Sequence, residues 1–107
     1  MSAGELGRTV DLLVRQVGHW QQPRWAMAGT APGAESRADL VYRLVQTLAD
    51  LGADAEGGPR RHVPRLDNDL VLIDQLRVVT ADLLAAGPPD DVLARAAAAT
   101  AATRDAL

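Results

Sequence analysis

Residues 65–87 read RLDNDLVLIDQLRVVTADLLAAG and form the longest strongly apolar run in a chain of 107 residues. Asp67 or Asn68 can cap the start of a helix, because a short side-chain oxygen accepts an unpaired N–H of the first turn. At the other end Gly87 can adopt the left-handed conformation that ends a helix, and the two prolines after it cannot continue one. The pattern predicts a helix over residues 68–86.

One face of this predicted helix is continuously apolar, and the opposite face is mixed. At 100° per residue the apolar side chains gather into one stripe. They are Leu72, Leu76, Val79 and Leu83, with Ile73 and Leu84 at the edges. Val71 and Val78 lie one heptad apart on the expected solvent side. Two interpretations stay open for these valines: a loop or helix of the same domain covers them, or they form the interface of a homodimer.

Apolar residues at helical spacing predict three more helices, over residues 4–20, 36–55 and 90–105. In the first helix the apolar stripe consists of Leu6, Val10, Leu13, Val17 and Trp20. In the second it consists of Leu40, Leu44, Leu48 and Leu51. The last helix is dominated by alanine, which favours helix formation but buries little apolar area. We therefore expect this helix to be the least stable of the four.

The connections between the helices are rich in glycine and proline. Pro23 can open a single helical turn within the connection that spans residues 21–34. The short link after Gly87 predicts that the last two helices form an antiparallel hairpin. We expect an all-α fold with one domain over residues 1–107. Its predicted architecture is a small up-and-down four-helix bundle, with an ordered or partly ordered loop and a short helical turn between the first two helices.

Composition argues against several classes of protein. The net charge of −3 disfavours a nucleic-acid binder, which normally needs a positive surface. The absence of cysteine excludes disulfides, thiolate zinc sites and cysteine nucleophiles. No apolar run is long enough for a membrane span, and the first residues lack the apolar segment of a signal peptide. We expect a bacterial cytoplasmic protein that binds neither nucleic acid nor membrane.

The strongest local charge feature is the segment over residues 59–65, PRRHVPR. Arginine side chains bind carboxylates and phosphates through paired hydrogen bonds, so this segment could hold a small anionic ligand. The candidate residues for such a site are Arg24, Arg60, Arg61, His62 and Arg65. The alternative interpretation is a solvated loop whose arginines pair with nearby aspartate and glutamate residues.

Two tryptophans stand close together in a chain that has only one other aromatic residue. Trp20 and Trp25 could anchor a partner protein, because tryptophan is enriched at the energetic centres of interfaces. With Val71 and Val78 they make up the candidate interface residues. The alternative is that both tryptophans pack against the ends of the helical bundle.

Motifs for catalysis or metal binding are missing from the sequence. His19 and His62 are the two histidines, and their spacing matches no pattern of metal ligands. The stretch 67–69, DND, is too short for a calcium-binding loop. Neither serine lies in a nucleophile motif. We therefore expect no catalytic residue, no metal and no cofactor.

These features favour a non-enzymatic protein-interaction module. Its partner would be another protein or a second copy of the chain in a homodimer. The alternative is a ligand-binding or enzymatic helical bundle with an anion site at residues 59–65. The two hypotheses differ in the surface they use, since the first depends on apolar side chains and the second on arginine.

Overall fold

The computed structural model describes residues 2–107, which fold into five α-helices and one 3₁₀ turn and contain no β-strand. The long helices are α1 (Ala3–Val17), α3 (Arg37–Glu56), α4 (Leu72–Ala85) and α5 (Asp90–Ala106). The short elements are α2 (Gln22–Trp25) and the 3₁₀ turn η1 (Asp69–Val71). The predicted all-α class is confirmed for this part of the chain, in which no helix is long and apolar enough to cross a membrane.

Local capping explains where the long helices begin and end. Ser2 accepts a hydrogen bond from the N–H of Glu5, and Ser36 accepts one from the N–H of Asp39. Gly57 ends α3 in the left-handed conformation, with φ of 72°. The helix predicted over residues 68–86 is divided, because its first turn forms η1 and α4 starts at Leu72.

The core lies between the four long helices. The apolar stripe predicted for α4 is buried, and Leu72, Leu76 and Leu83 are fully so. The other long helices contribute buried side chains to the same core: Leu6, Val10, Leu13 and Val17 from α1; Val41, Val45 and Leu48 from α3; Leu93, Ala96, Ala97 and Thr100 from α5. Burial of these stripes supplies the main driving force for folding.

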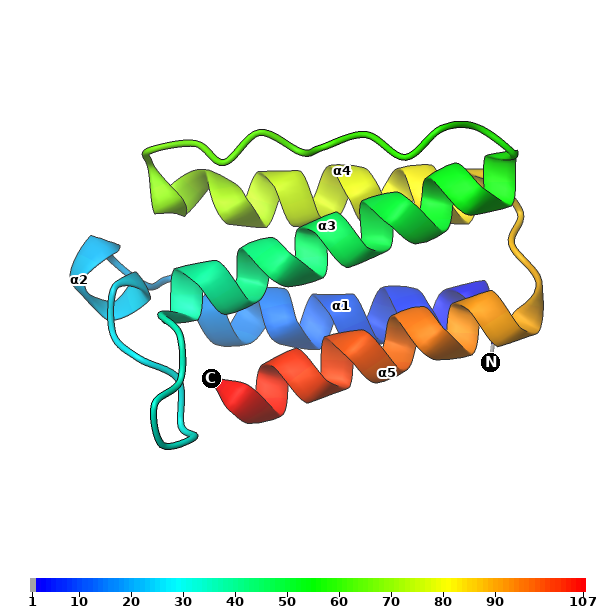
Figure 1. Ribbon diagram of the computed structural model, residues 1–107. Helices are drawn as coiled ribbons and strands as arrows, with labels where there is room; N and C mark the ends of the chain where they lie inside the picture. The colour runs from blue at the N-terminus through cyan, green and yellow to red at the C-terminus, as the bar shows by residue number, and fades with distance from the viewer. Residues whose placement is uncertain (1) are drawn as a thin grey trace.

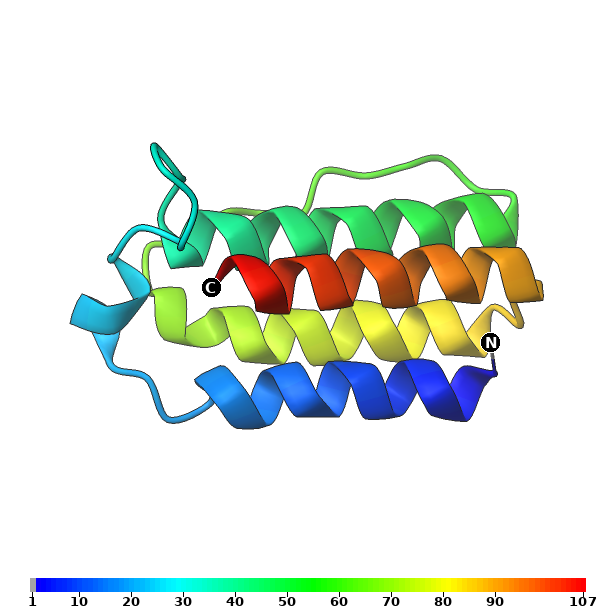
Figure 2. The same ribbon diagram turned by 90° about the horizontal axis from the view of Figure 1, so that it is seen from below.

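The directions of the helices differ from the up-and-down order predicted from the sequence. α3 and α4 both start at the α2 end of the molecule and run in the same direction, as do α1 and α5 (Figure 1, Figure 2). Residue contacts agree with the pictures. Arg65, just before α4, pairs with Asp39 near the start of α3. Gly52 near the end of α3 packs against Leu83 near the end of α4.

The connection between α3 and α4 explains this arrangement. We call its residues, 57–68, the strap. Twelve extended residues can span about 40 Å, whereas the 20 residues of α3 are about 30 Å long. The strap therefore returns along the whole length of α3, and α4 starts where α3 starts (Figure 1). The predicted order assumed that each connection joins neighbouring helix ends. An extended segment with two prolines can instead join helix ends that lie far apart.

The predicted hairpin of the last two helices is also corrected. α5 runs antiparallel to α4 (Figure 1), but it packs mainly against α1 and α3. The backbone of Pro89 is extended, with φ of −68° and ψ of 163°, and it leads the chain into α5. The α4–α5 link is thus short, yet the two helices it joins are not the ones that pack together most closely.

The loop of residues 26–36 holds the C-terminal end of α5. The N–H of Thr30 donates to the carbonyl of Ala106 over 2.8 Å, and Nε of Arg37, the first residue of α3, donates to the carbonyl of Leu107 over 3.2 Å. Gly29 lies so close to this end that an added Cβ would be 2.6 Å from the Ala106 oxygen. The loop thus satisfies helix-end carbonyls that would otherwise lack partners, a stabilisation that the alanine-rich sequence of α5 does not reveal.

Two glycine-to-alanine substitutions test this packing. Gly29→Ala should lower the free energy of unfolding by about 1–3 kcal/mol, because the new methyl group must displace main-chain atoms. Gly7→Ala is the control: its Cβ meets nothing within 4 Å inside α1, so it should raise stability by about 0.5–1 kcal/mol. Urea unfolding followed by circular dichroism measures both. Equal stability of Gly29→Ala and the parent protein would contradict the packing of the loop on α5.

Candidate functional site

The strap is bound to α3 through its main chain. The side-chain amide of Gln46 donates to the carbonyl of Arg61 over 3.0 Å and accepts from the N–H of Val63 over 2.8 Å. The hydroxyl of Tyr42 donates to the carbonyl of Val63. The Val63 side chain is half-buried and packs against the core. These contacts fix the middle of the strap along the polar face of α3.

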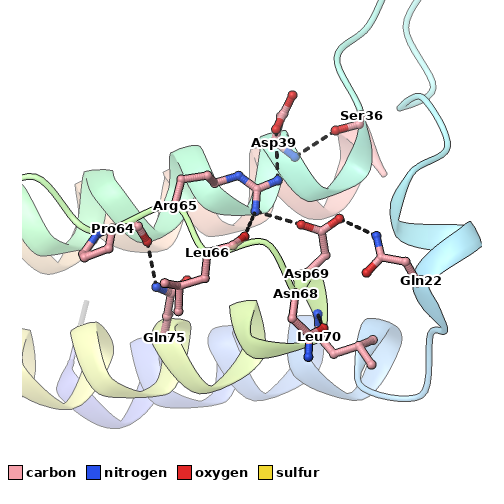
Figure 3. Close-up of polar contacts among 10 residues, drawn as sticks. All are labelled: Gln22, Ser36, Asp39, Pro64, Arg65, Leu66, Asn68, Asp69, Leu70 and Gln75. Atoms are coloured by element: carbon pink, nitrogen blue, oxygen red, sulfur yellow. Dashed lines mark hydrogen bonds and ion pairs between the residues drawn. The ribbon is translucent and has the colours of Figure 1, made fainter.

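Arg65 fixes the far end of the strap (Figure 3). Its guanidinium group lies 3.1 Å from a carboxylate oxygen of Asp39 and 2.8 Å from one of Asp69, and it stacks over the ring of Tyr42. Asp69 also accepts a hydrogen bond of 2.6 Å from Gln22 on α2. Partial burial acts to lower the pKa of Arg65, but the hydrogen bonds to Asp69 and Asp39 raise it above its usual value. This Arg65 cluster joins the strap to α2, α3 and η1.

Arg60 fixes the near end of the strap. Its Nε donates to one carboxylate oxygen of Asp54 over 3.0 Å, and its NH2 donates to the other over 2.7 Å. The hydrogen bond from Arg60 lowers the pKa of the Asp54 carboxyl below its usual value. Both side chains are well exposed, so this pair orients the strap more than it stabilises the fold.

The structure does not bring the five predicted anion-site residues together. Arg60 and Arg65 pair with Asp54 and Asp39, which are fifteen residues apart on α3 and therefore separated by about 22 Å. Arg24 lies on α2. For Arg60 and Arg65 the structure matches the alternative interpretation, in which arginines of a solvated loop pair with nearby carboxylates.

The remaining two predicted residues, Arg61 and His62, border an open hollow of about 470 Å³. We call it the strap groove; it lies between the strap, the C-terminal half of α3 and the facing part of α4. Its floor is apolar and is formed by Leu48, Ala49, Gly52, Ala53 and Val79. The volume falls within the range of about 300–1,000 Å³ that is typical of ligand sites.

Charged side chains of both signs border the strap groove. Arg61 and His62 stand on the strap, whereas Glu56 ends α3 and Asp82 lies on α4. The imidazole Nε2 of His62 is 3.4 Å from the hydroxyl of Tyr42. Within residues 2–107 none of these four side chains forms an ion pair. They are therefore available to a ligand, unlike Arg60 and Arg65.

The tryptophans belong to the core and not to an exposed surface. Trp25 is 1% exposed and Trp20 is 8% exposed. Their rings meet edge to face, with centroids 5.3 Å apart, and Arg37 and Arg24 lie over the Trp20 ring at 4.9 and 5.8 Å. Both tryptophans therefore pack at one end of the helices. Buried in this way, they do not offer an exposed anchor to a partner protein.

The two valines of the candidate interface differ in exposure. Val78 is 59% exposed, whereas Val71 is half-buried in η1. The loop of residues 26–36 packs on the end of α5. Isolated exposed apolar side chains are common on soluble proteins, so Val78 alone does not indicate an interface.

Residues 2–107 contain no group of three or more His, Asp or Glu side chains placed to hold a metal ion. A second hollow of about 290 Å³ lies beside the tryptophans and is bordered by His19, Asp74 and Arg77. Asp74 and Arg77 are 3.9 Å apart, as their spacing on one helix face predicts. This hollow is smaller than the strap groove and is lined in part by buried core residues.

Several residues that build the site were not singled out from the sequence. They are Tyr42 and Gln46 on α3 and Gln75 on α4. Gln75 donates to the carbonyl of Pro64 over 3.0 Å (Figure 3). The sequence pattern that could have indicated their role is a polar helix face followed by an extended, proline-containing segment. Such a segment needs hydrogen-bond partners for its main-chain groups.

Replacement of Arg65 tests the anchoring of the strap. Arg65→Ala should lower the free energy of unfolding by about 1–3 kcal/mol, because it leaves Asp69 and Asp39 without their charged partner. Arg43→Ala is the matched control: it removes only the exposed pair with Glu35 and should cost less than about 0.5 kcal/mol. Chemical unfolding of both variants gives the comparison. Equal losses would show that the Arg65 cluster is no more than a surface ion pair.

Comparison with protein-family models, with curated proteins and with solved structures found no match to this chain. The geometry of the strap and its groove is therefore the basis for assigning a function. A likeness of fold would in any case leave function to be argued from the site.

Proposed function

We propose that the protein is a non-enzymatic interaction module and that the strap groove binds a short segment of a partner protein. The observation that carries this proposal is an open groove of about 470 Å³ with an apolar floor and unpaired charges along its borders. We also propose that the four long helices form one bundle in which the strap is a long crossover connection. The bundle then acts as a rigid support for the groove.

The groove suits binding because its walls are held in place before a partner arrives. Gln46 and the Arg65 cluster fix the strap on one side, and the core fixes α4 on the other. A preformed site avoids much of the entropy loss that ordering a loop on binding would cause. The apolar floor supplies a favourable term when a side chain displaces water from it.

A homodimer through Val71 and Val78 has less support than the strap groove. Val78 is well exposed, but Val71 is half-buried and the tryptophans are in the core. Val78 is therefore the one well-exposed apolar side chain among the four candidate interface residues, and stable dimers usually bury large apolar areas.

A small anionic ligand is the second candidate, and Arg61 is the observation in its favour. Arg61 and His62 face the groove without carboxylate partners within residues 2–107. Glu56 and Asp82 border the same groove, however, and their negative charges would repel a simple anion. The mixed border fits a segment that carries both signs of charge better than it fits an anion.

Filling the groove tests the proposed function. Peptides would first be selected on the immobilised protein from a display library of random decapeptides. Ala53→Phe places a phenyl ring on the groove floor and should weaken the selected peptides at least tenfold, because it occupies the space of a partner side chain. Ala98→Phe is the control on the exposed face of α5 and should bind as the parent protein does.

Circular dichroism of both variants establishes that they are folded. Undiminished binding to folded Ala53→Phe would contradict the proposed function, and so would a library from which the parent protein selects no peptide.

A further inference from the structure

We infer that the partner segment is a peptide in which one aliphatic residue is accompanied by residues of both charges. This inference rests on the proposed function, because it specifies what the strap groove binds. Two features of the groove support it: the chemistry of the floor and the placement of the charges.

The floor of the strap groove favours an aliphatic side chain. Leu48 and Val79 are buried, and the small side chains of Ala49 and Ala53 leave space above them. Apart from the charged borders, the lining offers no side-chain hydrogen-bond donor or acceptor to a group on this floor. A polar side chain placed there would lose its water without gaining a partner, which is unfavourable.

The borders of the groove favour charges of both signs. The strap side carries the positive charge of Arg61, whereas Glu56 at the end of α3 and Asp82 on α4 are negative. Arg60 is already neutralised by Asp54, so it adds little to the positive side. A segment with charges of one sign would meet repulsion from one side of the groove, whereas a segment with both signs complements both sides.

Charge reversal on each side of the groove tests the inference. Decapeptides would be selected separately on the parent protein, on Arg61→Glu and on Asp82→Arg. The parent should enrich an aliphatic residue together with an acid and a base. Arg61→Glu should lose the acid and Asp82→Arg should lose the base, and each reversal should weaken parent-selected peptides about tenfold or more. Arg8→Glu and Asp90→Arg are exposed controls outside the groove and should leave the selection unchanged.

The outcomes separate this inference from the proposed function. The inference would be overturned if the peptides bound the parent but not Ala53→Phe, and if selection on Arg61→Glu and Asp82→Arg gave peptides with the same charges as selection on the parent. The groove would then remain the binding surface. If the parent protein selected no peptide, or if Ala53→Phe bound as the parent does, the proposed function itself would fail and the inference with it.

Discussion

The arrangement of the molecule depends on the binding of the strap's main chain along α3. Gln46 bonds to two strap residues, and Arg65 links the end of the strap to Asp39 and Asp69. Because the strap returns along the whole of α3, α4 has to start beside the start of α3 (Figure 1). The parallel order of these two helices, and the close packing of Gly52 against Leu83, follow from this one constraint.

The same constraint creates the strap groove. An extended segment beside two parallel helices contributes few apolar side chains, and Val63 is the partly buried one at its centre. Space therefore remains between the strap and α4, with an apolar floor below it and charges along both sides. The groove is a consequence of how the chain connects its helices, and the proposed binding function makes use of a site that the fold has already formed.

The sequence predicted the helices and their buried faces better than it predicted their arrangement. The spacing of Leu72, Leu76 and Leu83 determines which face of α4 is buried, and all three are fully buried. Periodicity says nothing about direction, so the parallel order of α3 and α4 was missed. The bonds from Gln46 to the strap join residues 15 and 17 positions apart, and no local pattern reveals such a pairing. The anion site was predicted from the clustering of arginines in the sequence. Because the strap is extended, these arginines are spread along α3, and Arg60 and Arg65 pair with carboxylates far apart on it.

The distance between α3 and each end of α4 tests this account most directly. The chain has no cysteine, so spin labels can be placed singly on exposed cysteines introduced at Arg43, Asp74 and Ala85. Asp74 and Ala85 share one face of α4 and are eleven residues, or about 16 Å, apart along it. The account predicts that the label at 43 lies closer to 74 than to 85. A shorter distance from 43 to 85 would show antiparallel helices and would contradict the crossing of the strap.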